Sequence, residues 1–244
     1  MAYNETGHAR NVANFQELVM VAKTMGNAYN PVALSIQIAN LDELVKQLQV
    51  NLQVVNEKNG VYRDKIYNRQ TSYEQMSELA MRIVNTVVGL GLDAKILAQT
   101  KSTLAKIRGG GKKKKAEATA SGETPAKTNS VSQMSFDQRK NNFDVLVNLV
   151  SAQANYKPNK EDMQVSSLQT YLDSLKNLNE EANQAEQDLT IARQQRDRLL
   201  YTENTGAMTL AQQIKGYVKG DFGVKSAEFE RVKGIRFNSI KINI

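Results

Sequence analysis

The chain has 244 residues, with 32 basic and 25 acidic side chains, 41% hydrophobic residues and no cysteine. These values are ordinary for a soluble globular protein, and the lack of cysteine excludes disulfides and thiolate metal sites. No stretch reaches the roughly 18 apolar residues of a membrane-spanning helix, and residues 1–15 lack the apolar run of a secretory signal, so we expect a cytoplasmic protein.

An internal repeat organises the sequence. NFQELV, which starts at Asn14, matches NFDVLV, which starts at Asn142, and a later constant register pairs Leu41 with Leu168. A register kept over about 90 positions indicates a duplication, since chance does not maintain it. We therefore divide the chain into copy one at 1–108, a disordered lysine-rich linker at 109–134 and copy two at 135–244.

Each copy is predicted to begin with a short helix that ends near a Tyr-x-Pro element. In copy one, Asn14 and Glu17 have capping-box spacing, and we expect the amino terminus, which contains His8, to be mobile. In copy two, Ser135 and Gln138 have the same spacing and predict an earlier start. The tyrosines that precede each proline, Tyr29 and Tyr156, are expected to plug a turn.

A long helix follows in each copy. After a stretch at 34–38 that alternates as an extended segment does, Asn40 and Glu43 predict a helix start, and apolar residues then recur in heptads to about residue 88. We expect this helix to continue through Gly60, because the matching position, Gln187, lies in a strongly helical run. One of its two heptad rows contains Leu41, Leu48, Val55, Tyr62, Arg69, Met76, Ile83 and Leu90.

Glycine-containing loops at 89–91 and 216–223 lead to a short closing helix in each copy. A helix from 40 to 88 would be roughly 70 Å long, whereas a flexible linker of this length typically reaches roughly 25–30 Å. If the long helices are antiparallel, the end of copy one lies beside the start of copy two, and a linker of this length can join them. The expected fold is therefore all-α: two tandem divergent repeats packed as an elongated antiparallel helical bundle.

The heptad rows of copy two carry charged residues at their middle. A solvated seam explains them, and so does a buried or partner-facing ion network that sets register. Arg69 and Arg196 occupy matching positions in the two copies, which favours the network. The candidate partner contacts are Arg69, Arg196, Arg193 and Glu186.

The lysine-rich linker carries much of the chain's charge. Residues 109–140 contain seven basic and three acidic side chains, whereas residues 141–244 contain thirteen of each. GGGKKKK does not fit the phosphate-loop pattern G-x-x-x-x-G-K-[ST]. Candidate phosphate contacts are Lys112, Lys113, Lys114 and Lys115, which could bind nucleic acid weakly. The simpler interpretation is a solubilising tether.

Catalytic chemistry has little support in the sequence. The single histidine, His8, lies in the segment expected to be mobile, and no metalloprotease, hydrolase or dinucleotide-binding motif is present. We expect no enzyme activity, no cofactor and no small-molecule substrate. The apolar stretch at 81–92 is too short to span a membrane, and a core-facing helix explains it better than membrane insertion.

The NF…LV starts, the AYNP and NYKP turns, the lysine-rich middle and the VKGIRF close resemble an uncharacterised family of small bacterial proteins built from two helical copies. The resemblance implies architecture and a bacterial source, but no activity. The expected function is a non-enzymatic structural or protein-interaction module that engages a protein partner or a second copy of the chain. The alternatives are a nucleic-acid-associated protein and, third, a membrane-active helical protein.

Overall fold

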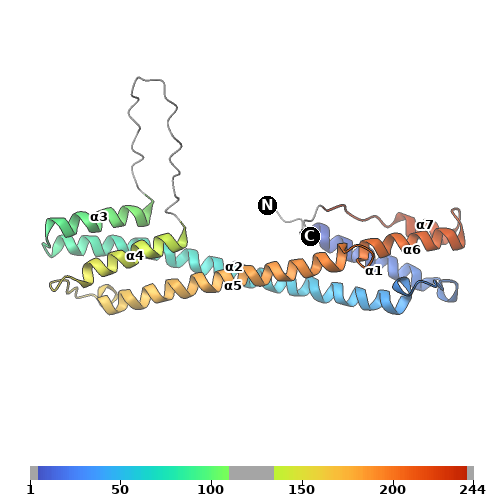
Figure 1. Cartoon of the computed structure of the whole chain (residues 1–244), viewed down its shortest axis with the longest axis horizontal. Helices are drawn as coiled ribbons and strands as arrows, with labels where there is room; N and C mark the ends of the chain where they lie inside the picture. Colours follow the sequence, from blue (N-terminus) through green and yellow to red (C-terminus); the bar gives the residue numbers. More distant parts are fainter. Residues whose placement is uncertain (1–4, 110–134, 241–244) are drawn as a thin grey trace, which may run out of the picture. The chain divides into compact units, whose positions relative to one another are not determined.

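The computed structural model describes residues 5–109 and 135–240, and every regular element in these two ranges is helical (Figure 1). The all-α class is confirmed for this part of the chain. The α-helices are α1 (Glu5–Thr24), α2 (Ile38–Gly89), α3 (Ala94–Arg108), α4 (Phe136–Ser151), α5 (Val165–Tyr201), α6 (Ala207–Phe222) and α7 (Ala227–Gly234). The 3-10 helices are η1 (Gly26–Ala28), η2 (Leu34–Ile36) and η3 (Glu161–Met163).

The chain forms two compact units that do not follow the two halves of the sequence. Unit 1 lies within Met1–Tyr62 and Ala185–Ile244, and unit 2 comprises Arg63–Gln184. Each unit therefore contains one part of α2 and one part of α5. An amphipathic helix needs a second element to cover its apolar stripe, and within each unit the other long helix helps to do so.

Unit 1 surrounds a core to which α1, α2, α5, α6 and α7 contribute, and α1 packs on both α6 and α7. Asn11 ties the carboxyl-terminal segment to α1, because its side chain bonds both the backbone N–H and the carbonyl of Asn238, at 2.7 and 3.0 Å. Central buried residues are Phe15, Leu18, Leu41, Leu48, Leu200, Ile214 and Val232.

Unit 2 has its own core, in which α3 packs on α4 and both cover α2 and α5. Arg139 of α4 donates to the carbonyls of Ile107, at 3.2 Å, and Tyr73, at 2.9 Å, and so joins α4 to α3 and α2. Central buried residues are Tyr73, Met76, Ile83, Ile107, Phe143, Leu168 and Leu175.

The two Tyr-x-Pro elements are built alike. The buried hydroxyl of Tyr29 donates to the carbonyl of Ile36 at 2.9 Å, and that of Tyr156 donates to the carbonyl of Met163 at 3.2 Å. In both cases the bond closes a loop that leads into a long helix. The expected role of these tyrosines as turn plugs is confirmed.

Burial of tyrosines predicts alkaline sensitivity. Burial raises the pKa of Tyr73, Tyr156 and Tyr171 to about 12. In the unfolded chain these phenols ionise near pH 10, so between about pH 10 and 12 the unfolded state loses protons that the folded state retains, and stability falls. We expect urea unfolding midpoints to fall over this range, and Tyr156→Phe to reduce the fall.

Tyr67, which is 68% exposed, provides the control for this experiment. Tyr67→Phe should leave the alkaline loss of stability unchanged. Equal effects of the two substitutions would contradict the assignment of the loss to buried phenols.

Four local expectations are wrong, one of them the loop at 216–223, because residues 216–222 belong to helix α6. Helix α1 begins at Glu5, so Asn14 lies inside it, and His8 is a buried helical residue instead of part of a mobile segment. Residues 34–36 form the 3-10 helix η2 instead of an extended stretch, because the chain must turn between Pro31 and the start of α2. Asn40 does not cap α2, and its amide donates instead to the carbonyl of Leu34 at 2.7 Å.

The long helix of copy two is shorter than the repeat predicts. Helix α5 ends at Tyr201, and Asn204 adopts a left-handed φ of 66° before α6 begins. In copy one, α2 continues to Gly89 and passes through Gly60, as predicted. Ser135 caps α4, as its spacing predicts, by accepting from the backbone N–H of Gln138 at 3.2 Å.

Candidate protein-interaction groove

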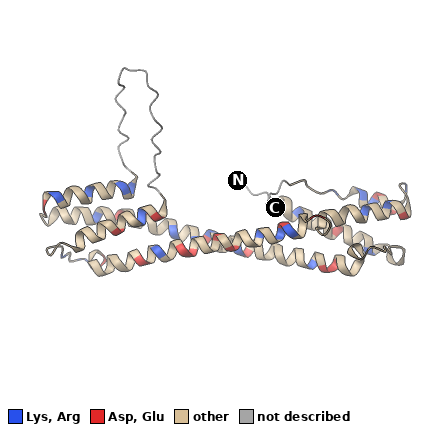
Figure 2. Ribbon diagram, viewed as in Figure 1, with Lys and Arg blue, Asp and Glu red and all other residues tan. Residues whose placement is uncertain are grey.

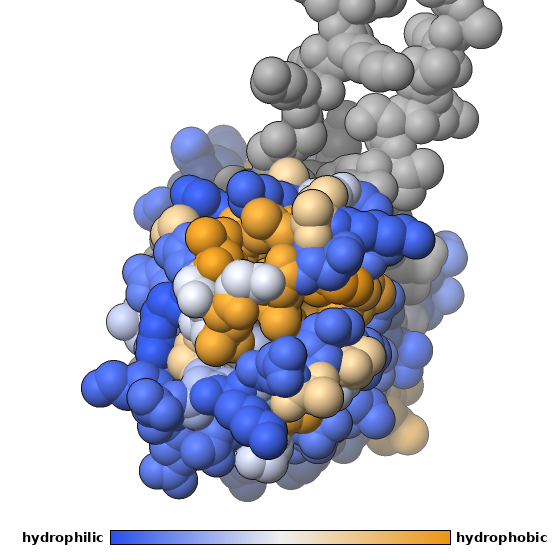
Figure 3. Space-filling model, turned by 90° about the vertical axis from the view of Figure 1, so that its left-hand side faces the viewer, coloured by the Kyte–Doolittle hydropathy of each residue, from blue (hydrophilic) through white to orange (hydrophobic). Residues whose placement is uncertain are grey.

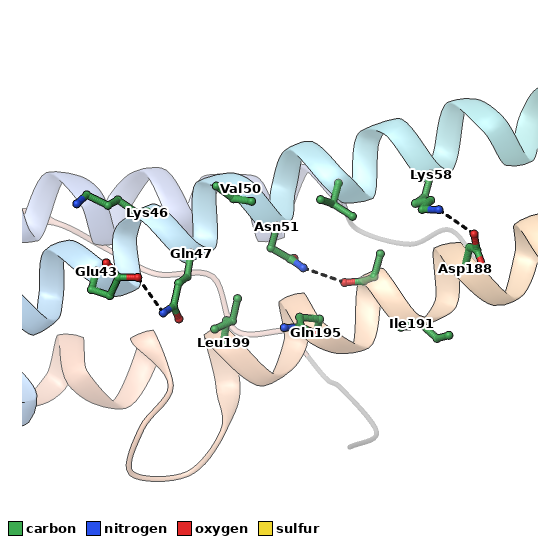
Figure 4. A pocket seen from close by; sticks show the side chains of 12 residues that line it. Glu43, Lys46, Gln47, Val50, Asn51, Lys58, Asp188, Ile191, Gln195 and Leu199 are labelled. Atoms are coloured by element: carbon green, nitrogen blue, oxygen red, sulfur yellow. Dashed lines mark hydrogen bonds and ion pairs between the residues drawn. The ribbon is translucent and has the colours of Figure 1, made fainter.

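A surface groove of about 600 Å³ lies between α2 and α5 in unit 1 (Figure 4). Its floor is mostly apolar and its two ends carry charged side chains. The residues that line it are Glu43, Lys46, Gln47, Val50, Asn51, Val54, Lys58, Asp188, Ile191, Ala192, Gln195 and Leu199. We call this feature the unit 1 groove.

Two contacts set the register of α2 and α5 beneath the unit 1 groove. Lys58 and Asp188 form an ion pair at 2.8 Å, and the amide of Asn51 donates to the carbonyl of Ala192 at 3.4 Å. Asn51 is only 8% exposed, and its Oδ1 has no hydrogen-bond partner. A buried acceptor left unpaired costs about 1–3 kcal/mol, and a buried Asn in a helical seam commonly fixes register at such a cost.

The walls of the groove expose branched apolar side chains. Val50 and Ile191 are each 62% exposed, from α2 and α5 respectively. Single exposed apolar residues are normal on protein surfaces, but here they flank one concave surface that also includes Val54 and Leu199. An apolar concave surface with a few polar groups is typical of a binding site.

The charges of the groove are divided between its ends. Glu43, Lys46 and Gln47 lie at one end, where Gln47 donates to Glu43 at 3.2 Å, and the Lys58–Asp188 pair lies at the other (Figure 4). Each end therefore carries one acidic and one basic side chain. The groove has no excess charge that would attract an anion or a cation.

The same positions in the other copy are polar. The register that pairs Leu41 with Leu168 matches Val50 with Asn177 and Val54 with Glu181, and on α5 it matches Ile191 with Asp64 and Ala192 with Lys65. In unit 2, Lys65 and Glu181 form an ion pair at 2.8 Å. Exposed apolar character at these positions is thus a property of unit 1 and not of the repeat pattern itself.

The predicted partner contacts are placed in different surroundings. Arg196 is 1% exposed inside unit 1, where its guanidinium donates to Asp197 at 2.8 and 3.0 Å. Arg69 is half-buried in unit 2, with its guanidinium 4.1 Å from the centre of the Phe136 ring. Arg193 is half-buried and Glu186 is exposed. A partner could reach Arg196 only if unit 1 opened, so the structure gives Arg196 an internal role.

Arg196 belongs to a buried polar cluster. The ring Nδ1 of His8 lies 2.9 Å from the hydroxyl of Tyr201 and 3.8 Å from Asp197. Asn11 donates to the same hydroxyl at 3.2 Å. Burial raises the pKa of Tyr201, whereas the hydrogen bond from Asn11 opposes this effect. The cluster joins α1 to α5 through these mutual contacts, and Tyr201 also lines a smaller cavity beside α6.

The predicted phosphate contacts, Lys112, Lys113, Lys114 and Lys115, lie outside the described residues. On most of the described helices basic and acidic side chains are interspersed (Figure 2), whereas α3 carries Lys95, Lys101, Lys106 and Arg108 and no acidic residue. Binding of a phosphate backbone typically uses basic residues clustered on one face or along a helix, and α3 is the described α-helix whose charged residues are all basic.

A second apolar surface lies at the end of unit 2, where α2 turns into α3 (Figure 3). Val88 and Leu90 are 51% and 40% exposed there, whereas Ile83, Val84 and Val87 of the same stretch are buried. The expectation that residues 81–92 face the core is therefore correct for these three residues.

Arg82 donates to Asp162 at 2.5 and 3.1 Å, and these bonds lower the pKa of that carboxyl.

Two searches of the described residues bear on other site types. No described helix is long and apolar enough to cross a membrane. Within residues 5–109 and 135–240, no group of three or more His, Asp or Glu side chains is placed to hold a metal ion.

The groove was not predicted from the sequence, although a signal for it exists. Val50, Val54 and Val61 recur at helical spacing beside the two heptad rows and form a third apolar row. In the structure Val50 and Val61 are 62% and 47% exposed, whereas Val54 is half-buried against Val55, Leu189 and Ala192, so the core uses only the middle of this row.

Comparisons with known proteins return no matching family model, no matching curated protein and no matching solved structure. The resemblance to two-repeat bacterial helical proteins stays a hypothesis.

Proposed function

We propose that the chain is a non-enzymatic protein-interaction module and that the unit 1 groove binds an amphipathic helix. The observation that carries the proposal is the exposure of Val50 and Ile191 on opposite walls of one apolar groove. An amphipathic helix recognises such a groove with apolar anchors spaced one turn apart.

The dimensions of the groove suit a helix. Its α2 wall extends from Glu43 to Lys58, which is about 22 Å or four turns at 1.5 Å per residue. A third helix laid between α2 and α5 would cover Val50, Val54 and Ile191 together. Each fully buried Val or Ile side chain contributes about 1.5–3 kcal/mol of transfer free energy, so three of them are sufficient for a specific contact.

Divergence of the two copies supports the same assignment. We infer that a duplicated helical unit gave rise to both long helices, and that only one α2–α5 surface carries apolar residues at the groove positions. In unit 2 the matching positions hold Asn177, Glu181 and the Lys65 that pairs with Glu181. A surface that needs only solubility can be polar, as in unit 2, so the apolar version is explained by a partner.

The two alternative functions have less support from the described residues. The nucleic-acid alternative depends on residues 112–115, which lie outside the described residues, and the described surface has mixed charge (Figure 2). The membrane alternative depends on residues 81–92, most of whose bulky apolar side chains already belong to the core of unit 2. Neither alternative has an apolar groove to support it.

Helical peptides selected against the immobilised protein test the proposal. From a library of helix-forming peptides, we expect binders with apolar residues at i, i+3 or i+4, and i+7. The double variant Val50→Lys/Ile191→Lys should weaken their binding roughly 100-fold, because lysine ammonium groups would be buried against the apolar anchors. Titration of labelled peptides by fluorescence anisotropy gives the dissociation constants.

The matched control is Asn177→Lys, at the unit 2 position that corresponds to Val50. This variant should bind the selected peptides as the unchanged chain does. Equal loss of binding in the control and groove variants would contradict the assignment of the groove as a helix-binding site. Selection of no peptide would contradict it as well, provided that the chain also fails to self-associate through the groove.

A further inference from the structure

We propose that the occupant of the unit 1 groove is a second copy of this chain, whose α2 lies antiparallel across α2 of the first. This inference rests on the proposed function, because it names the partner of the same groove. It follows from the arrangement of charge at the two ends of the groove.

A twofold interface must be complementary to itself. With α2 antiparallel to α2, each end of one groove lies over the opposite end of the other. Glu43 of one copy then faces Lys58 of the second copy, and Lys46 faces Asp188 of the second copy. Both contacts join opposite charges, and the symmetry generates each of them twice. A random distribution of the four charges would place like charges together as often as unlike ones.

The same symmetry places the apolar residues at the centre. Glu43 and Lys58 are equally distant in sequence from the middle of Val50 and Asn51, so the twofold axis crosses α2 at this point. Val50 of one copy therefore packs against Val50 of the other, and the Ile191 side chains cover the same region from α5. The resulting arrangement has an apolar centre and a charged rim, which is the usual composition of a protein interface.

Sedimentation equilibrium of the purified full chain provides the first test. We expect a dimer that dissociates in the micromolar range, at about 1–100 μM. Val50→Lys/Ile191→Lys should raise the dissociation constant roughly 100-fold, because the substitutions lie beside the twofold axis. Asn177→Lys should leave it unchanged. Far-UV circular dichroism checks that each variant is folded.

A charge exchange tests the antiparallel arrangement without altering net charge. The double variant Lys58→Asp/Asp188→Lys keeps an opposite-charge pair within the chain but places like charges at both contacts between copies. It should weaken the dimer roughly 10-fold. Adding Glu43→Lys/Lys46→Glu reverses the other end as well, and the quadruple variant should recover most of the lost affinity.

The absence of cysteine makes a geometric test simple. In the Val50→Cys variant the only two thiols of a dimer lie beside the axis, and a disulfide forms only when the two Cα atoms are within about 7 Å. Mild oxidation should therefore link this variant into covalent dimers. The Asn177→Cys variant, with the thiol at the matching exposed position of unit 2, should be linked far more slowly.

The outcomes separate this inference from the proposed function. A monomer at all concentrations, a dimer insensitive to the groove substitutions, or equally fast linkage of the two cysteine variants would overturn the second copy as occupant. If helical peptides still bound the groove in that case, the interaction module would stand with a different partner. If neither peptides nor a second copy bound, both proposals would fail together.

Discussion

Gly206→Ala is expected to destabilise unit 1 by about 3 kcal/mol or more, because the new methyl group has no space and its neighbours are backbone atoms. A Cβ at Gly206 would lie 2.7 Å from both the N and the O of Thr202 and 2.8 Å from the O of Leu200. These atoms belong to the chain reversal between α5 and α6, which the bond from the N–H of Gly206 to the carbonyl of Thr202 closes at 2.8 Å. The φ of −72° suits any residue, so the expected cost is steric alone.

Urea unfolding followed by far-UV circular dichroism measures this cost. The matched control is Gly216→Ala in the middle of α6, where a Cβ meets no atom within 4 Å. Alanine should stabilise that position by roughly 0.5–1 kcal/mol, because glycine is a poor helix former. If Gly206→Ala also stabilised the protein, the close approach of the two chain segments at this reversal would be contradicted.

The break at Gly206 also shows where sequence reasoning failed for the fold. The repeat correctly predicted a helix through Gly60, because the matching position, Gln187, lies in a strongly helical run. The same rows predicted too long a helix in copy two, because the repeat carried the copy one pattern over Thr202–Gly206. The chain between Tyr201 and α6 passes through Asn204, whose left-handed backbone conformation cannot be inferred from a repeat.

For the candidate site, the sequence pointed to charge whereas the structure points to exposed apolar residues. Arg196 stood out because it repeats Arg69, but burial in unit 1 makes it part of the core. Val50 and Ile191 did not stand out, because an apolar residue in a helix is normally assigned to the core. Only tertiary packing decides which of three apolar rows on α2 remains uncovered, and that information is not local.

Asp197→Ala is expected to cost about 3–5 kcal/mol of stability, because it removes the carboxylate that accepts hydrogen bonds from two nitrogens of the buried guanidinium of Arg196. Arg196 is among the largest fully buried side chains of the described residues, and both its Nε and a terminal nitrogen donate to Asp197 Oδ1. Adding Arg196→Met should recover part of the loss, because a buried charge that has lost a carboxylate partner costs more than an apolar side chain of similar length. The double-mutant cycle should therefore show a coupling of about 1–3 kcal/mol.

An exposed ion pair in the same unit provides the comparison. Lys233 and Glu230 lie 3.1 Å apart, with side chains that are 60% and 59% exposed. Glu230→Ala should change stability by less than about 1 kcal/mol, since solvent screens such a pair. Similar losses for Asp197→Ala and Glu230→Ala would show that Arg196 does not depend on Asp197. A large loss confined to Asp197→Ala would instead explain how Arg196, the arginine that matches Arg69, can occupy a core position. Its charge would then be compensated inside unit 1. Contact with a partner would be made by the apolar groove.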